Sequence, residues 1–266
     1  MLSNKKIHVR SLKVIYGPVA SWRLGKSLGL DLLCKPEKIC SFDCVYCQLE
    51  KTRKITTDRE IFVSTDKIKK GLKEALKQSK PDVITFSGMG EPTLAKNINE
   101  TIDVVRQLTK IPIAILTNST LMYQNDVKDA LLKLDIIVAK LDAPNSDLFK
   151  KINRPAVDVV FEETIKGIKE TRKKFKGNFS LQIMFIDENK DYAKEIADLA
   201  RSIKPDEVQI NTPLRPCSVR PLSKPTLEKI ESYFYGLNTL NVYNSIRPKT
   251  DPLDKMELIK RRRMET

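Results

Sequence analysis

Val83-Ile84-Thr85-Phe86 is a short, mostly apolar run, and Ser87-Gly88-Met89-Gly90-Glu91-Pro92 follows it at once as a turn rich in small residues. An apolar run of this length that ends in a turn is typical of a parallel strand buried between two layers. Runs of the same kind recur on both sides of it, at residues 28–33, 113–116, 136–141, 181–186 and 207–210. The chain is therefore expected to contain a parallel sheet.

Amphipathic segments separate these runs. Apolar residues recur three or four positions apart in residues 66–77, 97–108, 126–133, 159–174 and 192–203, as in helices with one buried face. The alternation predicts an α/β fold, a partial (β/α)6 barrel of TIM type. We expect this core over residues 28–215. An N-terminal extension (1–27) is expected to cover one end, and a C-terminal helical extension with a basic tail (216–266) to follow.

Composition limits the class of protein. The chain has 266 residues, 41% of them hydrophobic, which is enough for the core of one catalytic domain. Its longest apolar runs fall far short of the roughly 20 residues that a membrane-spanning helix needs, so no membrane span is expected. Residues 1–10 carry positive charge with no apolar stretch behind them, which does not fit a signal peptide. The expected location is the cytoplasm.

The charge of the chain is strongly positive. It has 48 Lys and Arg against 34 Asp and Glu, a net charge of +14 that would attract polyanions such as tRNA or other RNA. Much of this charge falls in helical segments, where it would equally serve to solvate outer faces. The run Lys260-Arg261-Arg262-Arg263 is read as a solvated end, with contact to RNA as the alternative.

Three of the five cysteines lie in one loop, Cys40-Ser41-Phe42-Asp43-Cys44-Val45-Tyr46-Cys47, beyond the first predicted strand. This crowding and the odd number favour a metal site in a reduced compartment over a disulfide framework. Thiolates suit iron–sulfur clusters, zinc or copper(I), so the ligand type leaves the metal open. A closed zinc site needs a fourth ligand, and Cys34 could supply it.

The spacing of these cysteines resembles the signature of the radical S-adenosylmethionine (SAM) superfamily, and Tyr46 stands at that signature's usual aromatic position. The resemblance implies that Cys40, Cys44 and Cys47 bind three irons of a 4Fe-4S cluster, while SAM binds the fourth iron. Such an open coordination site lets a ligand bind the metal directly. The resemblance also implies cleavage of SAM to methionine and a 5′-deoxyadenosyl radical, with a ferredoxin or a flavodoxin as electron donor.

A second match lies in the turn that follows Val83–Phe86. Its Gly88-Met89-Gly90-Glu91-Pro92 resembles the superfamily's glycine-rich segment, with Met89 in place of the first glycine. Loops at the carboxyl ends of barrel strands carry active sites, and small residues let the backbone approach a ligand. The resemblance implies that the backbone of residues 88–90, with Glu91 nearby, meets the amino group of SAM. An ordinary strand-to-helix turn is the alternative.

Later strand ends carry further candidates. Thr117-Asn118-Ser119 resembles a superfamily segment in which glycine often follows the asparagine, and Asn118 is a candidate for cofactor binding. Strand alternation places Lys140 and Asp142 on the same side. There, Asp142 could bind a ribose hydroxyl and Lys140 an anionic group, with a salt bridge between them as the alternative.

The remaining candidates are less specific. Arg154 could bind a carboxylate or phosphate through its planar guanidinium, or lie exposed on the surface. Gln182 and Asn211 are positioned to meet ribose or adenine if the superfamily arrangement holds. The catalytic candidates are thus Lys140 and Arg154. The cofactor-binding candidates are Tyr46, Gly88, Met89, Gly90, Glu91, Asn118, Asp142, Gln182 and Asn211.

Taken together, the motifs are most similar to the wybutosine-synthesis-related branch, which forms the tricyclic base 4-demethylwyosine in tRNA. Gln48 stands where that branch generally has tryptophan, and its additional N-terminal cysteines are lacking before Cys34. We therefore expect a relative that modifies an RNA base. The alternatives are a radical SAM enzyme acting on a peptide or small metabolite, and a noncatalytic zinc-binding RNA protein that uses Cys34.

Overall fold

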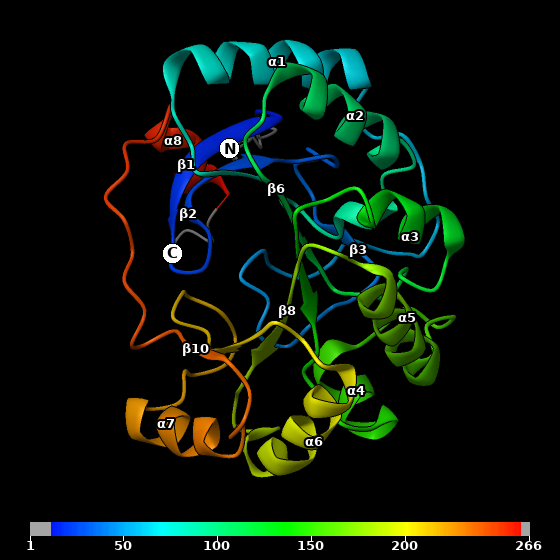
Figure 1. Ribbon diagram of the computed structural model, residues 1–266, viewed down its shortest axis with the longest axis vertical. Coiled ribbons are helices and arrows are strands. Elements are labelled where there is room, and N and C mark those ends of the chain that lie inside the picture. The colour runs from blue at the N-terminus through cyan, green and yellow to red at the C-terminus, as the bar shows by residue number, and fades with distance from the viewer. Residues whose placement is uncertain (1–11, 262–266) are drawn as a thin grey trace, which may run out of the picture.

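The computed structural model describes residues 12–261. Its main feature is one curled sheet of eight strands in the order β1-β2-β5-β6-β7-β8-β9-β10, which forms an open half-barrel (Figure 1). The strands are β1 (Ile15–Ser21), β2 (Gly25–Leu30), β5 (Val83–Phe86), β6 (Ile113–Thr117), β7 (Ile136–Lys140), β8 (Asn178–Met184), β9 (Glu207–Asn211) and β10 (Thr239–Asn241). The predicted α/β partial barrel is confirmed.

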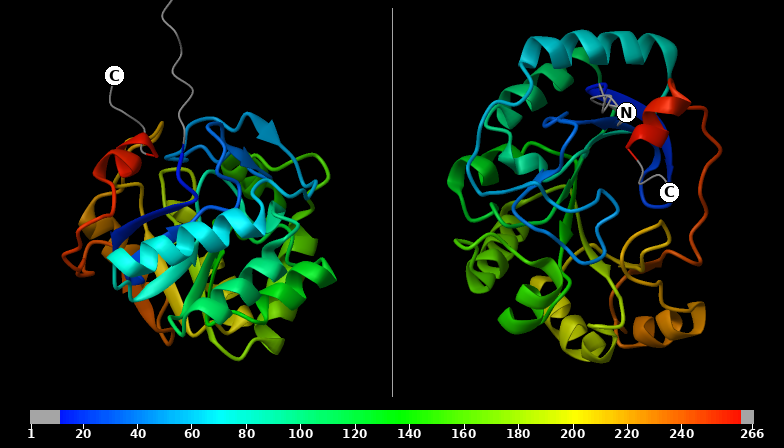
Figure 2. Two further views of the ribbon diagram at one scale, coloured as in Figure 1. Left: turned by 90° about the horizontal axis from the view of Figure 1, so that it is seen from above. Right: turned by 180° about the vertical axis from the view of Figure 1, so that it is seen from behind.

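Helices cover the outer face of this sheet (Figures 1 and 2). They are α1 (Thr65–Gln78), α2 (Ile98–Leu108), α3 (Asn125–Leu131), α4 (Ser146–Asn153), α5 (Phe161–Lys174), α6 (Ala193–Ile203) and α7 (Lys224–Ser232). The short helix α8 (Lys255–Lys260) instead packs against β1 on the face opposite to α1. Two short 3-10 helices, η1 (Pro92–Leu94) and η2 (Lys190–Tyr192), and a small second sheet of β3 (Ile39–Cys40) and β4 (Lys54–Ile55) complete the fold. No helix within residues 12–261 is both long and apolar enough to cross a bilayer.

The six predicted strands are all present and run parallel, from β2 and β5 through to β9. Two of them begin earlier than predicted. β2 starts at Gly25 rather than at residue 28, and β8 starts at Asn178 rather than at residue 181. The added residues include Ser27, Asn178 and Ser180, whose polar side chains hid the strands from a search for apolar runs. Their backbones still pair with the neighbouring strands.

Segments outside the predicted core also join the sheet. From the expected N-terminal extension, β1 pairs antiparallel with β2, while β10 of the C-terminal segment pairs parallel with β9. The chain from β10 to α8 then runs along the open side between these two edges (Figures 1 and 2). There the Leu253 N–H donates to the Gly17 carbonyl at 2.7 Å. How residues 1–27 and 216–266 divide into units stays a prediction.

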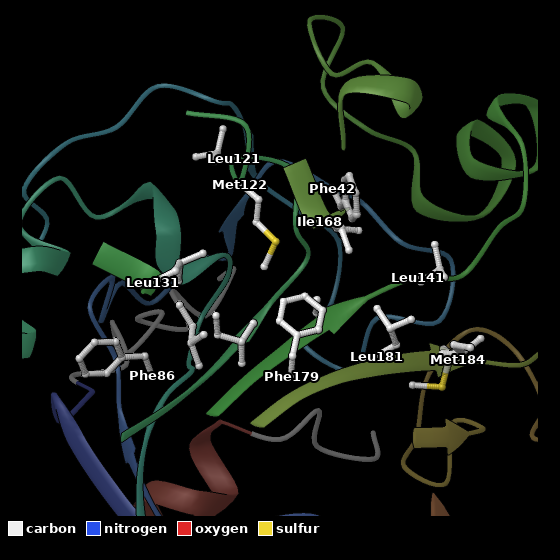
Figure 3. Packing of buried hydrophobic residues seen from close by; sticks show 14 of the residues in the cluster. Phe42, Phe86, Leu121, Met122, Leu131, Leu141, Ile168, Phe179, Leu181 and Met184 are labelled. Carbon is white, nitrogen blue, oxygen red and sulfur yellow. The ribbon is translucent and has the colours of Figure 1, made fainter. Parts of the chain in front are cut away.

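The two faces of the sheet differ in chemistry. Ile84, Phe86, Ile137, Leu181 and Val208 are fully or almost fully buried and belong to the apolar core that packs against the helices. Figure 3 shows part of this core, including Phe86, Leu131 and Phe179. On the other face, strand register places polar positions side by side, with Lys140 beside Gln182 and Gln182 beside Gln209. The interior of the half-barrel is therefore partly polar.

Candidate functional site

The cysteine loop lies at the carboxyl ends of the strands and is fastened by its backbone. Its Asp43 N–H donates to the Asn153 carbonyl at 3.0 Å, and its Val45 N–H donates to the Ile152 carbonyl at 3.0 Å. Cys40 also belongs to β3, which pairs with β4. These bonds tie the loop to the end of α4, so its thiols have fixed surroundings.

Two of the three thiols each face a side-chain amide. Asn118 Nδ2 lies 3.5 Å from Cys40 Sγ and donates to Ser41 Oγ at 2.8 Å. Asn153 Nδ2 lies 3.5 Å from Cys44 Sγ. Burial raises the pKa of the Cys40 thiol to about 12 and that of the Cys44 thiol to about 11. The amides are placed to donate to sulfur, which stabilises a thiolate bound to a metal.

The end of β7 contacts the same loop through a buried carboxylate. Asp142 accepts hydrogen bonds from the Tyr46 hydroxyl, from Asn153 Nδ2 at 2.8 Å and from the Met184 N–H at 2.9 Å. Lys140 Nζ lies 3.7 Å from Asp142, so the salt bridge considered as an alternative is present. The structure thus gathers Tyr46, Lys140 and Asp142, with the Asp142 carboxylate engaged by protein groups.

Lys140 retains some exposure and has a polar neighbour on the next strand. Its Nζ donates to Gln182 Oε1 at 3.0 Å and lies 5.1 Å from the centre of the Tyr46 ring. Its side chain is 18% exposed. Gln182 Nε2 is buried and has no hydrogen-bond partner among residues 12–261. This pair therefore presents a cation and an unused amide donor on the inner face of the sheet.

The glycine-rich turn after β5 packs tightly against two other segments. A Cβ added at Gly88 would lie 2.1 Å from the Asp31 carboxyl carbon, and one at Gly90 would lie 1.6 Å from the Ile39 carbonyl oxygen. Gly90 also has a φ of 144°. The Met89 N–H donates to Asp31 Oδ2 at 3.2 Å. These glycines are needed for close packing against β3 and Asp31, whether or not a ligand approaches.

The carboxylate of Glu91, in the same turn, is engaged by protein groups. Its buried carboxylate accepts hydrogen bonds from Thr93, from Thr117 Oγ1 at 2.7 Å and from the Asn118 N–H at 2.6 Å. Burial is the largest influence on this carboxyl group and raises its pKa. Glu91 therefore fastens the end of β6 to the turn after β5.

The other predicted residues are dispersed. Ser119, where glycine is usual, adopts a φ of 75°, so serine takes the left-handed conformation here. Arg154 is exposed and contacts the cysteine loop through its carbonyl, which accepts the Asp43 N–H at 3.1 Å. Asn211 Oδ1 accepts the Thr212 N–H at 2.9 Å. Arg261, expected in a solvated tail, is buried and pairs with Asp31 at 2.6 Å, while the tail's Arg262 and Arg263 lie outside the described residues.

Sequence reasoning missed three residues near the site. Asn153 was passed over in favour of its neighbour Arg154, and only the folded structure brings it to Cys44. Asn189 donates to the Asp142 and Met184 carbonyls at 2.9 Å each, and nothing in its local sequence marks it. Lys38 is buried two positions before Cys40, and strand alternation could have pointed to it, because residues two apart share a face.

Cys34 lies in a different environment from the three loop cysteines. Its Sγ donates to the Leu12 carbonyl at 3.3 Å. Burial raises the pKa of its thiol, with Asp31 as the next largest influence. Among residues 12–261, no three His, Cys, Asp or Glu side chains gather as a ready single-ion site. The contact with Leu12 gives the Cys34 thiol a partner of its own and does not support it as a fourth ligand.

A half-barrel with three cysteines over the carboxyl ends of its strands has the architecture of the radical SAM enzymes. The model of the radical SAM superfamily matches residues 36–200, which include the cysteine loop and much of the sheet. The chain belongs to this superfamily, whose enzymes use a 4Fe-4S cluster and SAM as cofactors.

Several relatives share much of the sequence. A UPF0026 protein of Methanocaldococcus jannaschii is 34% identical over 89% of this chain and 74% of its own length. A protein of Brachyspira hyodysenteriae named GTPase Obg is 38% identical over 87% of this chain, which spans only 35% of that protein. A probable GTP 3′,8-cyclase of Saccharolobus islandicus is 25% identical over 85% of this chain and 70% of its own length.

Solved structures share the fold. SuiB of Streptococcus suis bound to SAM superposes with a TM-score of 0.60 over 77% of this chain and 48% of its own, at 18% identity. The structure of anSMEcpe with bound AdoMet gives a TM-score of 0.61 over 82% of this chain and 64% of its own, at 16% identity. These likenesses extend to the fold alone. Membership of the wybutosine-related branch stays a prediction.

Proposed function

We propose that Cys40, Cys44 and Cys47 hold the 4Fe-4S cluster and that the chain cleaves SAM reductively at this site. The observation that carries the proposal is the setting of the thiols, with an amide nitrogen 3.5 Å from the sulfur of Cys40 and another 3.5 Å from that of Cys44. Hydrogen bonds to the sulfurs are a usual means of tuning iron–sulfur clusters. The soft, three-thiol donor set suits the cluster.

The cluster, when bound, supplies the electron that cleaves SAM to methionine and a 5′-deoxyadenosyl radical, and the chain's own residues position the reactants. The backbone of residues 88–90 lies beside β3 and is assigned to the amino group of SAM. Asn118, Gln182 and Asn211 are assigned to the adenosyl part, and Lys140 to an anionic group. Asp142 keeps Tyr46 and Asn153 in place through its hydrogen bonds. A ferredoxin or a flavodoxin is the proposed electron donor.

The first assay tests the cleavage itself. Protein reconstituted anaerobically with iron and sulfide is given SAM and a reductant, and 5′-deoxyadenosine is measured by chromatography. We expect this product from the native chain, and at least a hundredfold less from a Cys47→Ala variant. A fully loaded cluster that gives no 5′-deoxyadenosine would overturn the proposal. Cys217→Ser is the control, because Cys217 Sγ donates to the Val219 carbonyl at 3.2 Å, outside the loop.

For the substrate, we propose a base in RNA. The support is the net charge of +14, which favours a polyanionic partner. Binding of tRNA should weaken steeply as salt rises, because each phosphate contact releases counterions. Labelled tRNA titrated at several salt concentrations, with a neutral polymer as competitor, measures this slope. A salt-independent or undetectable affinity would remove RNA from consideration.

A small nucleotide is the second candidate. Two observations favour it: the similarity to a probable GTP 3′,8-cyclase, and the polar inner face that carries Lys140, Gln182 and Gln209. A cation and amides there could receive a phosphate and a base edge. If GTP accelerates 5′-deoxyadenosine formation while tRNA does not, the small nucleotide takes precedence over RNA.

A further inference from the structure

Lys38 is a buried cation whose ammonium lacks a hydrogen-bond partner. Its side chain is only 3% exposed, and Nζ makes no hydrogen bond with any of residues 12–261. The nearest opposite charge is Asp43, whose Oδ1 lies 4.0 Å away and already accepts the Thr52 N–H at 2.7 Å. Burying a charge without a close partner is costly, so such a group calls for a compensating ligand.

The ammonium lies beside the cysteine loop. Asp43, the carboxylate 4.0 Å from Nζ, belongs to that loop and directly precedes Cys44. The backbone holds Lys38 in place, because its carbonyl accepts the Arg53 N–H at 3.1 Å. Lys38 and Cys40 also lie two positions apart, on the same side of an extended segment. The cation therefore lies beside the cysteine loop, on the side that Cys40 shares.

We propose that Lys38 raises the reduction potential of the cluster held by Cys40, Cys44 and Cys47. Reduction adds one negative charge to a group that already carries three thiolates. A fixed positive charge beside it, in surroundings of low dielectric constant, stabilises the reduced state more than the oxidised state. Net charge and hydrogen bonds to sulfur are established determinants of such potentials. Lys38 thereby makes the cluster easier for a protein reductant to reduce.

This inference rests on the proposed function, since it needs a cluster on the three cysteines. The test is a redox titration of the reconstituted protein without SAM, in which electron paramagnetic resonance follows the reduced cluster. At the potential that reduces half of the native clusters, we expect the ratio of reduced to oxidised cluster to fall at least tenfold in Lys38→Met. A tenfold change corresponds to about 59 mV for one electron.

Matched variants keep the test decisive. Lys35→Met removes an exposed lysine three positions earlier and should leave the midpoint unchanged. Lys38→Arg keeps the charge and should restore most of the native midpoint. Asp43→Asn removes the carboxylate nearest to Lys38 and should move the midpoint upward, opposite to Lys38→Met. If Lys38→Met takes up no cluster, the midpoint potentials of Lys38→Arg and Asp43→Asn decide whether the inference holds.

The inference would be overturned if the ratio of reduced to oxidised cluster in Lys38→Met, measured at the native midpoint and at full iron and sulfide content, stays within threefold of the native ratio. An Asp43→Asn midpoint that stays unchanged or falls would also overturn it. Failure of the proposed function is a different result, because the native chain itself would then fail to take up a cluster or to cleave SAM. The spectroscopic midpoint requires no turnover and so separates the two.

Discussion

The turn after β5 and the end of β7 each contain a buried carboxylate, and the two have different surroundings. Glu91 accepts its hydrogen bonds from residues of the turn and of the β6 end, Thr93, Thr117 and Asn118. Asp142 instead accepts from Tyr46 on the cysteine loop and from Asn153 beside it, and lies next to the partly exposed Lys140. The first carboxylate joins framework segments, whereas the second connects the cysteine loop to side chains that a ligand can reach.

Similar buried acids at neighbouring strand ends therefore need not share a role. Substitutions near Glu91 should act mainly on stability. Substitutions near Asp142 should act mainly on cofactor handling and turnover, and the cysteine loop should depend on both.

The largest effect is expected from removing a cysteine of the loop that both regions support. Cys44→Ala deletes the sulfur that faces Asn153 and should abolish most iron uptake, because two thiolates do not retain the cluster. Iron and sulfide analysis after reconstitution measures this. Cys34→Ser should bind iron like the native chain, and an equal loss in Cys34→Ser would instead favour a four-cysteine zinc site.

Lys140→Met tests the role of the residues at the end of β7. Loss of the cation should slow formation of 5′-deoxyadenosine by at least tenfold, since one well-placed charged donor is worth about 2–4 kcal/mol to a reaction. The free energy of unfolding should change by about 1 kcal/mol or less. Steady-state assays measure the rate of 5′-deoxyadenosine formation, and denaturant titrations measure the free energy of unfolding. Lys110→Met, an exposed lysine, serves as control. Unchanged kinetics with lost stability would reverse the roles of the two regions.

Glu91→Gln tests the framework side. The amide keeps the size of the carboxylate but turns an NH2 group toward N–H and O–H donors, so at least one buried hydrogen bond is lost. We expect a loss of about 1–3 kcal/mol in the free energy of unfolding, measured by urea titration. Glu100→Gln, at an exposed position on α2, should lie within about 0.5 kcal/mol of the native chain. A native-like stability for Glu91→Gln would contradict the anchoring role.

The smallest expected effect is a pH dependence of the stability that Glu91→Gln loses. Burial raises the pKa of Glu91 in the folded state. Over the interval between the unfolded and the folded pKa, the folded chain binds more protons, so the contribution of this group to stability falls as pH rises. Glutamine does not titrate there. The stability advantage of the native chain over Glu91→Gln should therefore shrink from about pH 4 upward. Urea titrations at a series of pH values measure it, and an advantage that grows with pH would refute the assignment.

Local sequence was enough to predict the parts of the fold that depend on local pattern. Val83–Phe86 forms a strand over the predicted residues, and the cysteine loop stands beyond the first parallel strand. The beginning of β8 at Asn178 was missed because polar side chains interrupt the apolar run while the backbone still pairs with β7. The edge strand β10 was missed because only pairing with β9 defines it.

The candidate site likewise has residues that the sequence predicts and residues that only the folded structure reveals. The thiols, the glycine-rich turn and the pair of Lys140 and Asp142 follow from motif and alternation. Asn153 became visible only once the chain brought it to Cys44, because its role depends on a contact, whereas the spacing of Lys38 from Cys40 could have been read from the sequence. Glu91 shows the reverse case, in which a recognised motif residue has its carboxylate engaged by three neighbouring residues.

The central claim is that the three cysteines leave one iron free to bind SAM. The most direct measurement is electron–nuclear double resonance on the reduced cluster with SAM labelled at its carboxylate carbon and amino nitrogen. We expect a hyperfine coupling to both labels and a shift of the resonance signal when SAM is added. A spectrum that is unchanged by SAM, in protein with a full cluster, would contradict it.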